Sequence, residues 1–263
     1  MQQTPYALVM LLTLPAYSAR IPAQTAAQIV QRSVVNTRAD WTEAPQFDFT
    51  EHDVIVKNGV RTEQTYQVLM IDGSPYDKML AIDGHPLSPS ETAKENRKLA
   101  QEIKRRRRES AAARQDRIAD YQKQHHQDHE LMAQMVQAFD YQLLGIETVD
   151  GHQCFVLSAS PRPGYEPINR ETKVLKGMRG KLWIDTEQYQ WVKVLAEVFR
   201  PVAFGFFIAK VDPGTEFILE QQPVEGNLWL PSHFNMIVKA KIFFYSRNST
   251  DDETYTGYRR VTP

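Results

Sequence analysis

Apolar and polar residues alternate with a period of two along most of the C-terminal half of the chain. The clearest run places Phe234, Met236 and Val238 on one side of a strand and Lys239 on the other side. Such alternation is typical of antiparallel sheets that keep one face in contact with water. The pattern therefore predicts a largely antiparallel β-structure over residues 140–260.

A second alternating run occupies residues 190–199. Here Val192 and Val194 are predicted to point to one face, while Lys193 and Glu197 point to the opposite face. The face that carries Val194 is expected to lie inside the fold, because it is apolar along the whole run.

Dipeptides that favour tight turns separate the predicted strands. An Asn-Gly pair lies at 58–59, and Asp-Gly pairs lie at 72–73 and 150–151. These pairs signal hairpins, because both central residues of the favoured turn need positive φ. Strands joined in this way form a meander, and about ten to eleven of them would curl into a half-open barrel.

One helix is predicted before the first strand. Ala26, Ile29, Val30 and Val34 recur at helical spacing, which indicates an amphipathic helix that ends at about Arg38.

A charged helical insertion is predicted at residues 88–139. The sequence at 88–91 forms a capping box with proline at the first helical position, and Ser110 provides a second N-cap. Residues 91–130 contain eleven basic and eight acidic residues and few apolar ones. The expected fold class is therefore α+β: a half-open antiparallel barrel with an N-terminal helix and a charged two-helix insertion.

The N-terminus carries the features of an export signal. Residues 6–16 are mostly apolar, a length that suits a signal peptide and falls short of a membrane span. We expect a signal peptide at 1–18 and a single mature domain at 19–263, located in the periplasm. No cysteine follows the apolar stretch, so a lipid anchor is not expected. The alternative is that 6–16 forms a buried element of the fold.

Composition excludes several classes of function. The net charge of −1 argues against a nucleic-acid-binding protein. The single cysteine, Cys154, excludes an intramolecular disulfide and a zinc site built on several cysteines. His152 lies two residues away, which leaves a hydrolase as a minor alternative to an inert, buried thiol. Nucleophile elbows, phosphate loops and dinucleotide-binding glycines are absent from the sequence, so we expect no enzyme, no cofactor and no metal.

Three sequence segments resemble a known superfamily. Gly180–Asp185 (GKLWID), Tyr189–Val194 (YQWVKV) and Glu225–Pro231 (EGNLWLP) are similar to the central hairpin and a later strand of the LolA/LolB-like proteins. Two further segments, 72–76 and 161–165, look like those of exported bacterial proteins called outer-membrane lipoprotein-sorting proteins or left uncharacterised. The resemblance implies a half-open barrel with helices over its concave face, which carries a lipid or the acyl chain of a lipoprotein.

Two sets of apolar residues are candidates for lipid binding. One is the run 202–209, where Phe204, Phe206 and Phe207 would form a hydrophobic lip or, alternatively, part of a core strand. The other is the inward row of the sheet, which would line a lipid cavity or fill a packed interior. Its members are Leu182, Ile184, Val194, Phe234, Met236 and Val238.

The charged insertion suggests a second, different function. Helices within 88–139 would form an arm that docks an envelope protein, with the barrel packed solid. The run Arg105–Arg108 would favour anionic headgroups during a transient contact with a membrane surface. Because four consecutive helical residues point around the helix, a solvated helix is the simpler interpretation of this run.

Overall fold

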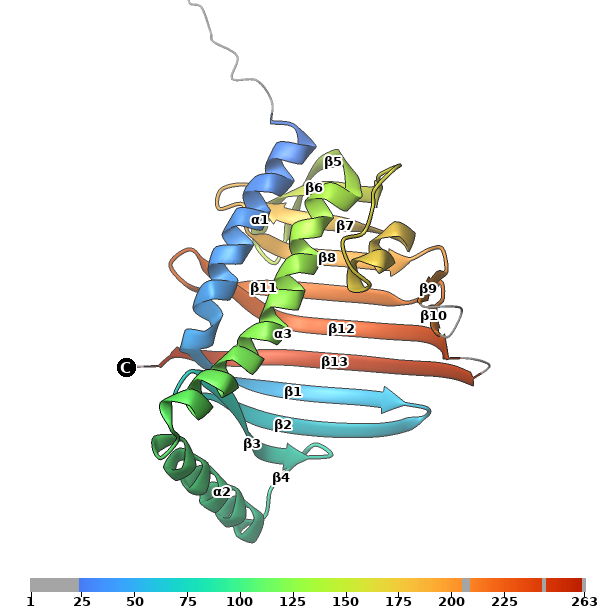
Figure 1. Cartoon of the computed structure of the whole chain (residues 1–263). Coiled ribbons are helices and arrows are strands. Elements are labelled where there is room, and N and C mark those ends of the chain that lie inside the picture. The colour runs from blue at the N-terminus through green and yellow to red at the C-terminus, as the bar shows by residue number, and fades with distance from the viewer. Residues whose placement is uncertain (1–23, 205–208, 243–244, 262–263) are drawn as a thin grey trace, which may run out of the picture.

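The computed structural model describes residues 24–204, 209–242 and 245–261 as one large sheet with helices on one of its faces (Figure 1). The helices are α1 (Ala26–Glu43), α2 (Pro89–Arg107) and α3 (Ala111–Ala138), with short 3-10 helices at Ala44–Gln46 and Glu171–Gly177. The strands are β1 (Phe47–Lys57), β2 (Val60–Ile71), β3 (Ser74–Ile82), β4 (His85–Pro86), β5 (Phe139–Val149), β6 (His152–Pro161), β7 (Met178–Asp185), β8 (Trp191–Val198), β9 (Val202–Phe204), β10 (Ala209–Val211), β11 (Glu216–Glu225), β12 (Leu228–Ile242) and β13 (Tyr245–Arg260).

All strand pairs are antiparallel. Eleven strands follow the order β4-β3-β2-β1-β13-β12-β11-β8-β7-β6-β5, while β10 pairs with β12 and β9 pairs with β10. The first long strand thus pairs with the last one, which joins the N-terminal meander to the C-terminal one. The sheet ends at β4 and β5 and does not close into a barrel. The predicted α+β class with an open antiparallel sheet is confirmed.

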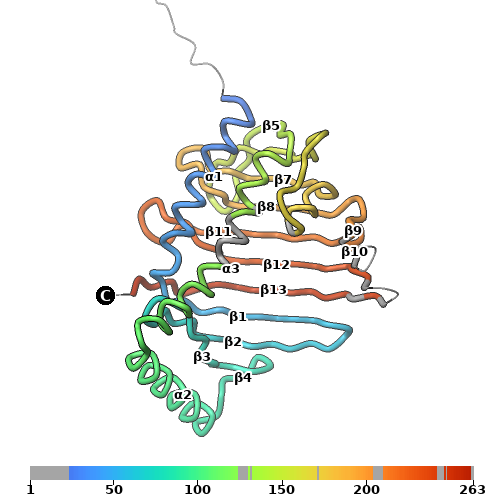
Figure 2. Tube along the Cα trace, in the orientation of Figure 1, coloured from blue at the N-terminus to red at the C-terminus, as the bar shows by residue number. Residues whose placement is uncertain are grey.

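Helices α1 and α3 lie across one face of the sheet, which we call the inner face (Figure 1). The Cα trace shows both helices crossing the strands, while α2 lies beyond β3 (Figure 2). Seen from this side, the strands β11, β12, β13 and β1 continue past the two helices (Figures 1 and 2). The inner face is therefore covered over only part of its area.

Local sequence signals form the predicted turns and caps. Asn58 and Gly59 have φ of 52° and 82°, and Asp150 and Gly151 have φ of 49° and 85°. These values are the ones that a two-residue hairpin turn of the predicted type requires. The Ser88 side chain caps α2 in the predicted capping box.

The main core lies between the helices and the strands β5–β8. Ile29, Val30 and Val34 of α1 pack there against Leu157 and Trp191. The Trp191 indole donates a hydrogen bond of 2.9 Å to Ser33 Oγ of α1. This contact satisfies a polar group that burial would otherwise leave unpaired.

Two local expectations were wrong. Helix α1 ends at Glu43 and not near Arg38, because the buried stripe continues through Thr37 and Asp40, which apolar spacing does not reveal. Val192 does not share a face with Val194. It packs in a separate cluster with Cys154 and Trp229, because the β7–β8 register shifts at this point, and such a bulge reverses the side on which residues lie.

Candidate functional site

The predicted inward row of the sheet lies on the inner face. The register places Leu182 opposite Val194, Val194 opposite Leu219, and Leu219 opposite Phe234. Residues directly opposite one another in an antiparallel pair point to the same face. Ile184 joins them in the core cluster beneath α1 and α3.

One half of this row is packed core. Leu182, Ile184 and Val194 are each 1% exposed or less, because helices α1 and α3 cover them. A ligand would have to displace a helix to reach these three side chains.

The other half of the row is only partly buried. Phe217, Leu219, Phe234 and Met236 lie on adjacent strands β11 and β12, and all four are intermediate in exposure. The rings of Phe217 and Phe234 lie 6.0 Å apart between centroids. We call these four residues the apolar strip. Phe234 and Met236 belong to the predicted row, whereas Phe217 and Leu219 were not among the predicted residues. A ligand would reach all four without rearrangement of the helices.

Val238 lies farther along β12. It lines a shallow hollow of about 340 Å³ near the β1–β2 turn, together with Asn58 and Ser249. Ile237 and Lys239, which alternate with Val238 and face the opposite side, also line this hollow, so it lies outside the apolar strip.

Carboxylates continue the same rows on the neighbouring strands. Phe234 lies opposite Glu253, and Met236 lies opposite Asp251. Glu253 in turn lies opposite Asp53 on β1. The apolar strip is thus bordered directly by acidic side chains on the same face.

Five carboxyl groups gather in this part of the inner face, and we call them the acidic patch. They are Glu51, Asp53, Asp77, Asp251 and Glu253. Sequence reasoning did not identify them. Their alternation along β1 was the available signal, but Val54 and Val56 on the opposite face of that strand are the residues that hydropathy would place inside.

Aromatic side chains surround the acidic patch. Glu51 lies between Tyr66 on β2 and Tyr255 on β13, and the Tyr255 hydroxyl donates a hydrogen bond to Glu253. The Phe49 ring packs against Tyr255, with centroids 5.9 Å apart. Aromatic rings therefore lie beside Glu51 and Glu253 on this surface.

The patch has unusual electrostatics. Burial and the nearby charges of Asp53 and Glu253 raise the pKa of Glu51 to about 8. Burial also raises the pKa of Asp53, Asp77 and Glu253 above their ordinary values. No described residue with a positive charge is among the causes of these shifts except His52, beside Asp53. Burial and neighbouring carboxylates are thus the main influences that raise the pKa of these four groups.

Two oxygens of the patch are unpartnered. Asp53 Oδ1 and Asp251 Oδ1 are buried atoms without a hydrogen-bond partner among the described residues. Unpaired buried oxygens of this kind are costly in free energy, so a donor brought by a ligand would relieve that cost.

The predicted lip is described only in part. β9 pairs with β10, and Val202 of β9 is 6% exposed. Phe204 ends β9 and lies opposite Ala209. Phe206 and Phe207 lie outside the described residues.

Arg106 corrects the expectation that the whole run Arg105–Arg108 is solvated. Its side chain is only 5% exposed. The guanidinium donates hydrogen bonds of 2.7 Å to the carbonyls of Ile71 and Ser74 and of 2.9 Å to that of Pro75. Arg106 thus anchors α2 to the β2–β3 turn. A fully solvated helix would lack this anchor.

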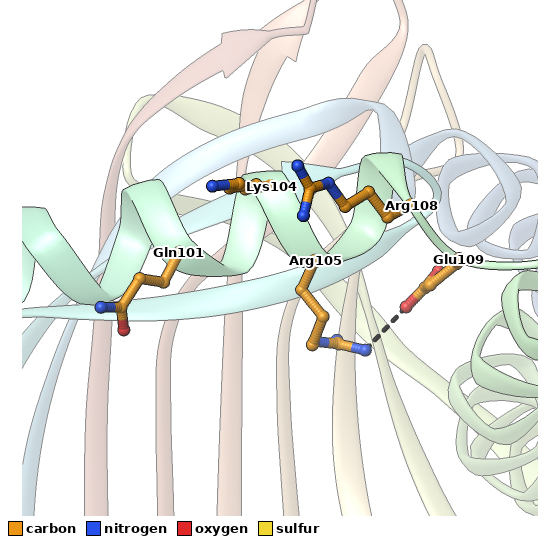
Figure 3. A pocket seen from close by; sticks show the side chains of 5 residues that line it. All are labelled: Gln101, Lys104, Arg105, Arg108 and Glu109. Atoms are coloured by element: carbon orange, nitrogen blue, oxygen red, sulfur yellow. Dashed lines mark hydrogen bonds and ion pairs between the residues drawn. The ribbon is translucent and has the colours of Figure 1, made fainter.

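Arg105 and Arg108 line a surface hollow together with Gln101, Lys104 and Glu109 (Figure 3). Arg105 pairs with Glu102 and Glu109, at 2.5 Å and 2.8 Å. Together with Lys104 and Arg108, it borders this open hollow of about 470 Å³. The net result is a basic outer surface on an anchored helix.

Cys154 does not form a reactive site. Its side chain is fully buried, and burial raises the pKa of the thiol to about 11. The thiol donates to the His152 carbonyl, while the His152 ring lies 3.5 Å from Asp185. A protonated, inaccessible thiol does not act as a nucleophile. Within the described residues, no group of three or more His, Cys, Asp or Glu side chains is arranged to hold a metal ion, and no helix is long and apolar enough to span a bilayer.

Comparison with known proteins gives similarity at the level of solved structures. No family model and no curated protein matches the chain. A LolA superfamily protein of Nitrosomonas europaea is 14% identical, with 92% of this chain and 96% of that chain covered and a TM-score of 0.33. A DUF1329 family protein of Desulfovibrio piger is 10% identical, with 90% and 94% covered and a TM-score of 0.34. A domain described as an outer membrane lipoprotein-sorting protein, from Vibrio parahaemolyticus, is 11% identical, with 89% and 94% covered and a TM-score of 0.35.

These three structures share 10–14% identity with the chain. Identities of this size assign no ligand and no partner to this chain.

Proposed function

We propose that this chain is a non-catalytic carrier or sensor of the cell envelope that holds an acyl chain of a lipid or lipoprotein on the inner face of its open sheet. The signal peptide at 1–18 and the periplasmic location expected from the sequence form part of this proposal.

The apolar strip is the observation that carries the proposal. It extends the packed core along the same cross-strand rows but is only partly buried. Phe217 and Leu219 contact the core at one end of the strip. An acyl chain laid on such a surface is stabilised by about 0.8 kcal/mol for each methylene group removed from water.

The packed core supports one refinement of the expected lipid site. Leu182, Ile184 and Val194 would keep α1 and α3 in place, whereas Phe234 and Met236 would contact the ligand. In the proposal, Phe204, Phe206 and Phe207 keep the role predicted from the sequence, a hydrophobic lip that contacts the acyl chain.

Binding of the neutral fluorescent probe N-phenylnaphthylamine tests the proposal. The mature chain is expected to enhance the probe's fluorescence, and Phe234→Ser with Met236→Ser is expected to abolish that enhancement. Ile237→Ser is the matched control, because Ile237 lies on the same strand and faces the opposite side. Absence of probe binding to the wild-type chain, or equal binding by all three proteins, would contradict the proposal.

Retention of a natural lipid is a second test. Native mass spectrometry of the chain purified from a bacterial periplasm should show adducts of lipid mass. Phe204→Ser, Phe206→Ser and Phe207→Ser together should remove these adducts without loss of the fold, as judged by circular dichroism. An unfolded triple variant would instead identify the run as core.

The alternative function is a protein-interaction module that uses the helices at 88–139 as a docking arm. The anchored α2, with its basic outer surface at Lys104, Arg105 and Arg108, favours it. Charge reversal by Lys104→Glu and Arg108→Glu separates the two. It should leave probe binding unchanged and impair the cellular role only if the arm is the functional surface.

A further inference from the structure

The inner face offers a ligand two chemically different surfaces side by side. Along one row the residues are Leu219 on β11, Phe234 on β12, Glu253 on β13 and Asp53 on β1. Neighbouring strands lie about 4.8 Å apart. The change from apolar to acidic therefore happens within one strand spacing, between Phe234 and Glu253.

A second row repeats the same change. Phe217 lies opposite Met236, and Met236 lies opposite Asp251. Because two adjacent rows change at the same strand boundary, the border between the apolar strip and the acidic patch runs along the gap between β12 and β13.

We infer that the acyl-chain ligand carries a positively charged nitrogen, which lies on the acidic patch while the chain lies on the apolar strip; this inference rests on the proposed function. The ligand class is thus an amphiphile with one hydrocarbon chain and an ammonium head group.

Charge complementarity supports an ammonium group. Glu253 lies directly opposite Asp53, and Glu51 lies two residues from Asp53 on the same strand, so a cation among these carboxyls would replace mutual repulsion by attraction. The unpartnered oxygens Asp53 Oδ1 and Asp251 Oδ1 provide acceptors for its N–H donors. A carboxylate or phosphate head would add to the repulsion.

The aromatic rings favour an organic cation. Tyr66 and Tyr255 lie on either side of Glu51, and the face of an aromatic ring attracts an ammonium group. Because the carboxylates come from the three strands β1, β3 and β13, the patch suits a head group that contacts several acceptors.

Three ligands with the same dodecyl chain test the head-group preference. Dodecylammonium, dodecanoate and dodecyl maltoside are compared, below their micelle concentrations, as competitors of N-phenylnaphthylamine. Dodecylammonium is expected to displace the probe at about tenfold lower concentration than dodecanoate, with the maltoside between them.

Amide variants locate the preference. Asp53→Asn with Asp251→Asn keeps the size of both side chains and removes like charges, so the variant is expected to fold. In this variant, the concentrations of dodecylammonium and dodecanoate that displace the probe should differ by no more than about twofold. Asp252→Asn is the matched control, because Asp252 is the next residue on the same strand, faces the other side and contacts His233 and Asn235.

The outcomes separate this inference from the proposed function. If the probe binds and the three dodecyl ligands compete equally, the head-group inference is overturned while the apolar site stands. If neither the probe nor any dodecyl ligand binds, the proposed function fails. An ammonium preference that persists in Asp53→Asn with Asp251→Asn would overturn the placement on the acidic patch.

Discussion

The two halves of the inner face differ in the kind of side chain that they present. Under α1 and α3, strands β6–β8 present only packed apolar side chains, such as Leu182 and Val194. Across β13, β1 and β3, the same face presents Glu253, Asp53 and Asp77. The difference teaches that the helices determine where the sheet needs an apolar surface. Where the strands extend past the helices, the face is free to carry charge.

The largest expected effect comes from the covered half. Leu182→Ala should lower the free energy of unfolding by about 2–5 kcal/mol, because a fully buried leucine leaves a cavity when it is truncated. Phe234→Ala in the partly exposed apolar strip should cost clearly less, although phenylalanine is larger. Urea unfolding of both variants measures the difference. Equal losses would mean that the strip is core as well.

Arg106 tests how the α2–α3 arm is attached at the far end of the polar half. Arg106→Met should destabilise the docking of α2 by about 3 kcal/mol, since three backbone carbonyls of the β2–β3 turn lose a charged donor. Hydrogen exchange in α2 and β3 should rise accordingly. Arg107→Met, at the exposed neighbouring position, should change stability by less than about 0.5 kcal/mol.

The polar half predicts a pH dependence of stability. The pKa of Glu51 is raised from 4.5 to about 8, so between these values the folded chain keeps a proton that the unfolded chain has lost. Stability should therefore fall as the pH rises through this window. Glu51→Gln should remove part of the fall and stabilise the chain by about 2 kcal/mol above pH 8. Thermal unfolding from acid to alkaline pH measures this fall in stability. A flat profile for the wild type would contradict the raised pKa of Glu51.

The smallest effect is expected at Cys154. With its thiol buried and the pKa raised to about 11, iodoacetamide should not modify the folded chain near neutral pH and should modify it readily in denaturant. Mass spectrometry detects the adduct. Rapid modification of the native chain would return the hydrolase alternative to consideration.

Much of the fold was predictable because its signals are local. The pairs at 58–59 and 150–151 form the expected turns, and Ser88 caps its helix as predicted. Alternation along β12 placed Phe234 and Met236 correctly on one face.

The remaining features depend on contacts between distant residues. The bulge at Val192 arises from pairing with β7, and no local pattern marks it. Arg106 contacts carbonyls more than thirty residues away. Asp53 and Asp251 come together only because the first long strand pairs with the last. Since the sequence does not reveal this pairing, both residues look like ordinary solvent-exposed aspartates.

Photocrosslinking tests the division of the inner face most directly. A dodecylammonium ligand with a diazirine at the end of its chain should label the inner side of β11 and β12, at Phe217, Phe234 or Met236. Peptide mass spectrometry locates the label, and Asp53→Asn with Asp251→Asn should disperse it. Labelling centred on α2, or on the face of β12 that carries Ile237, would contradict the account.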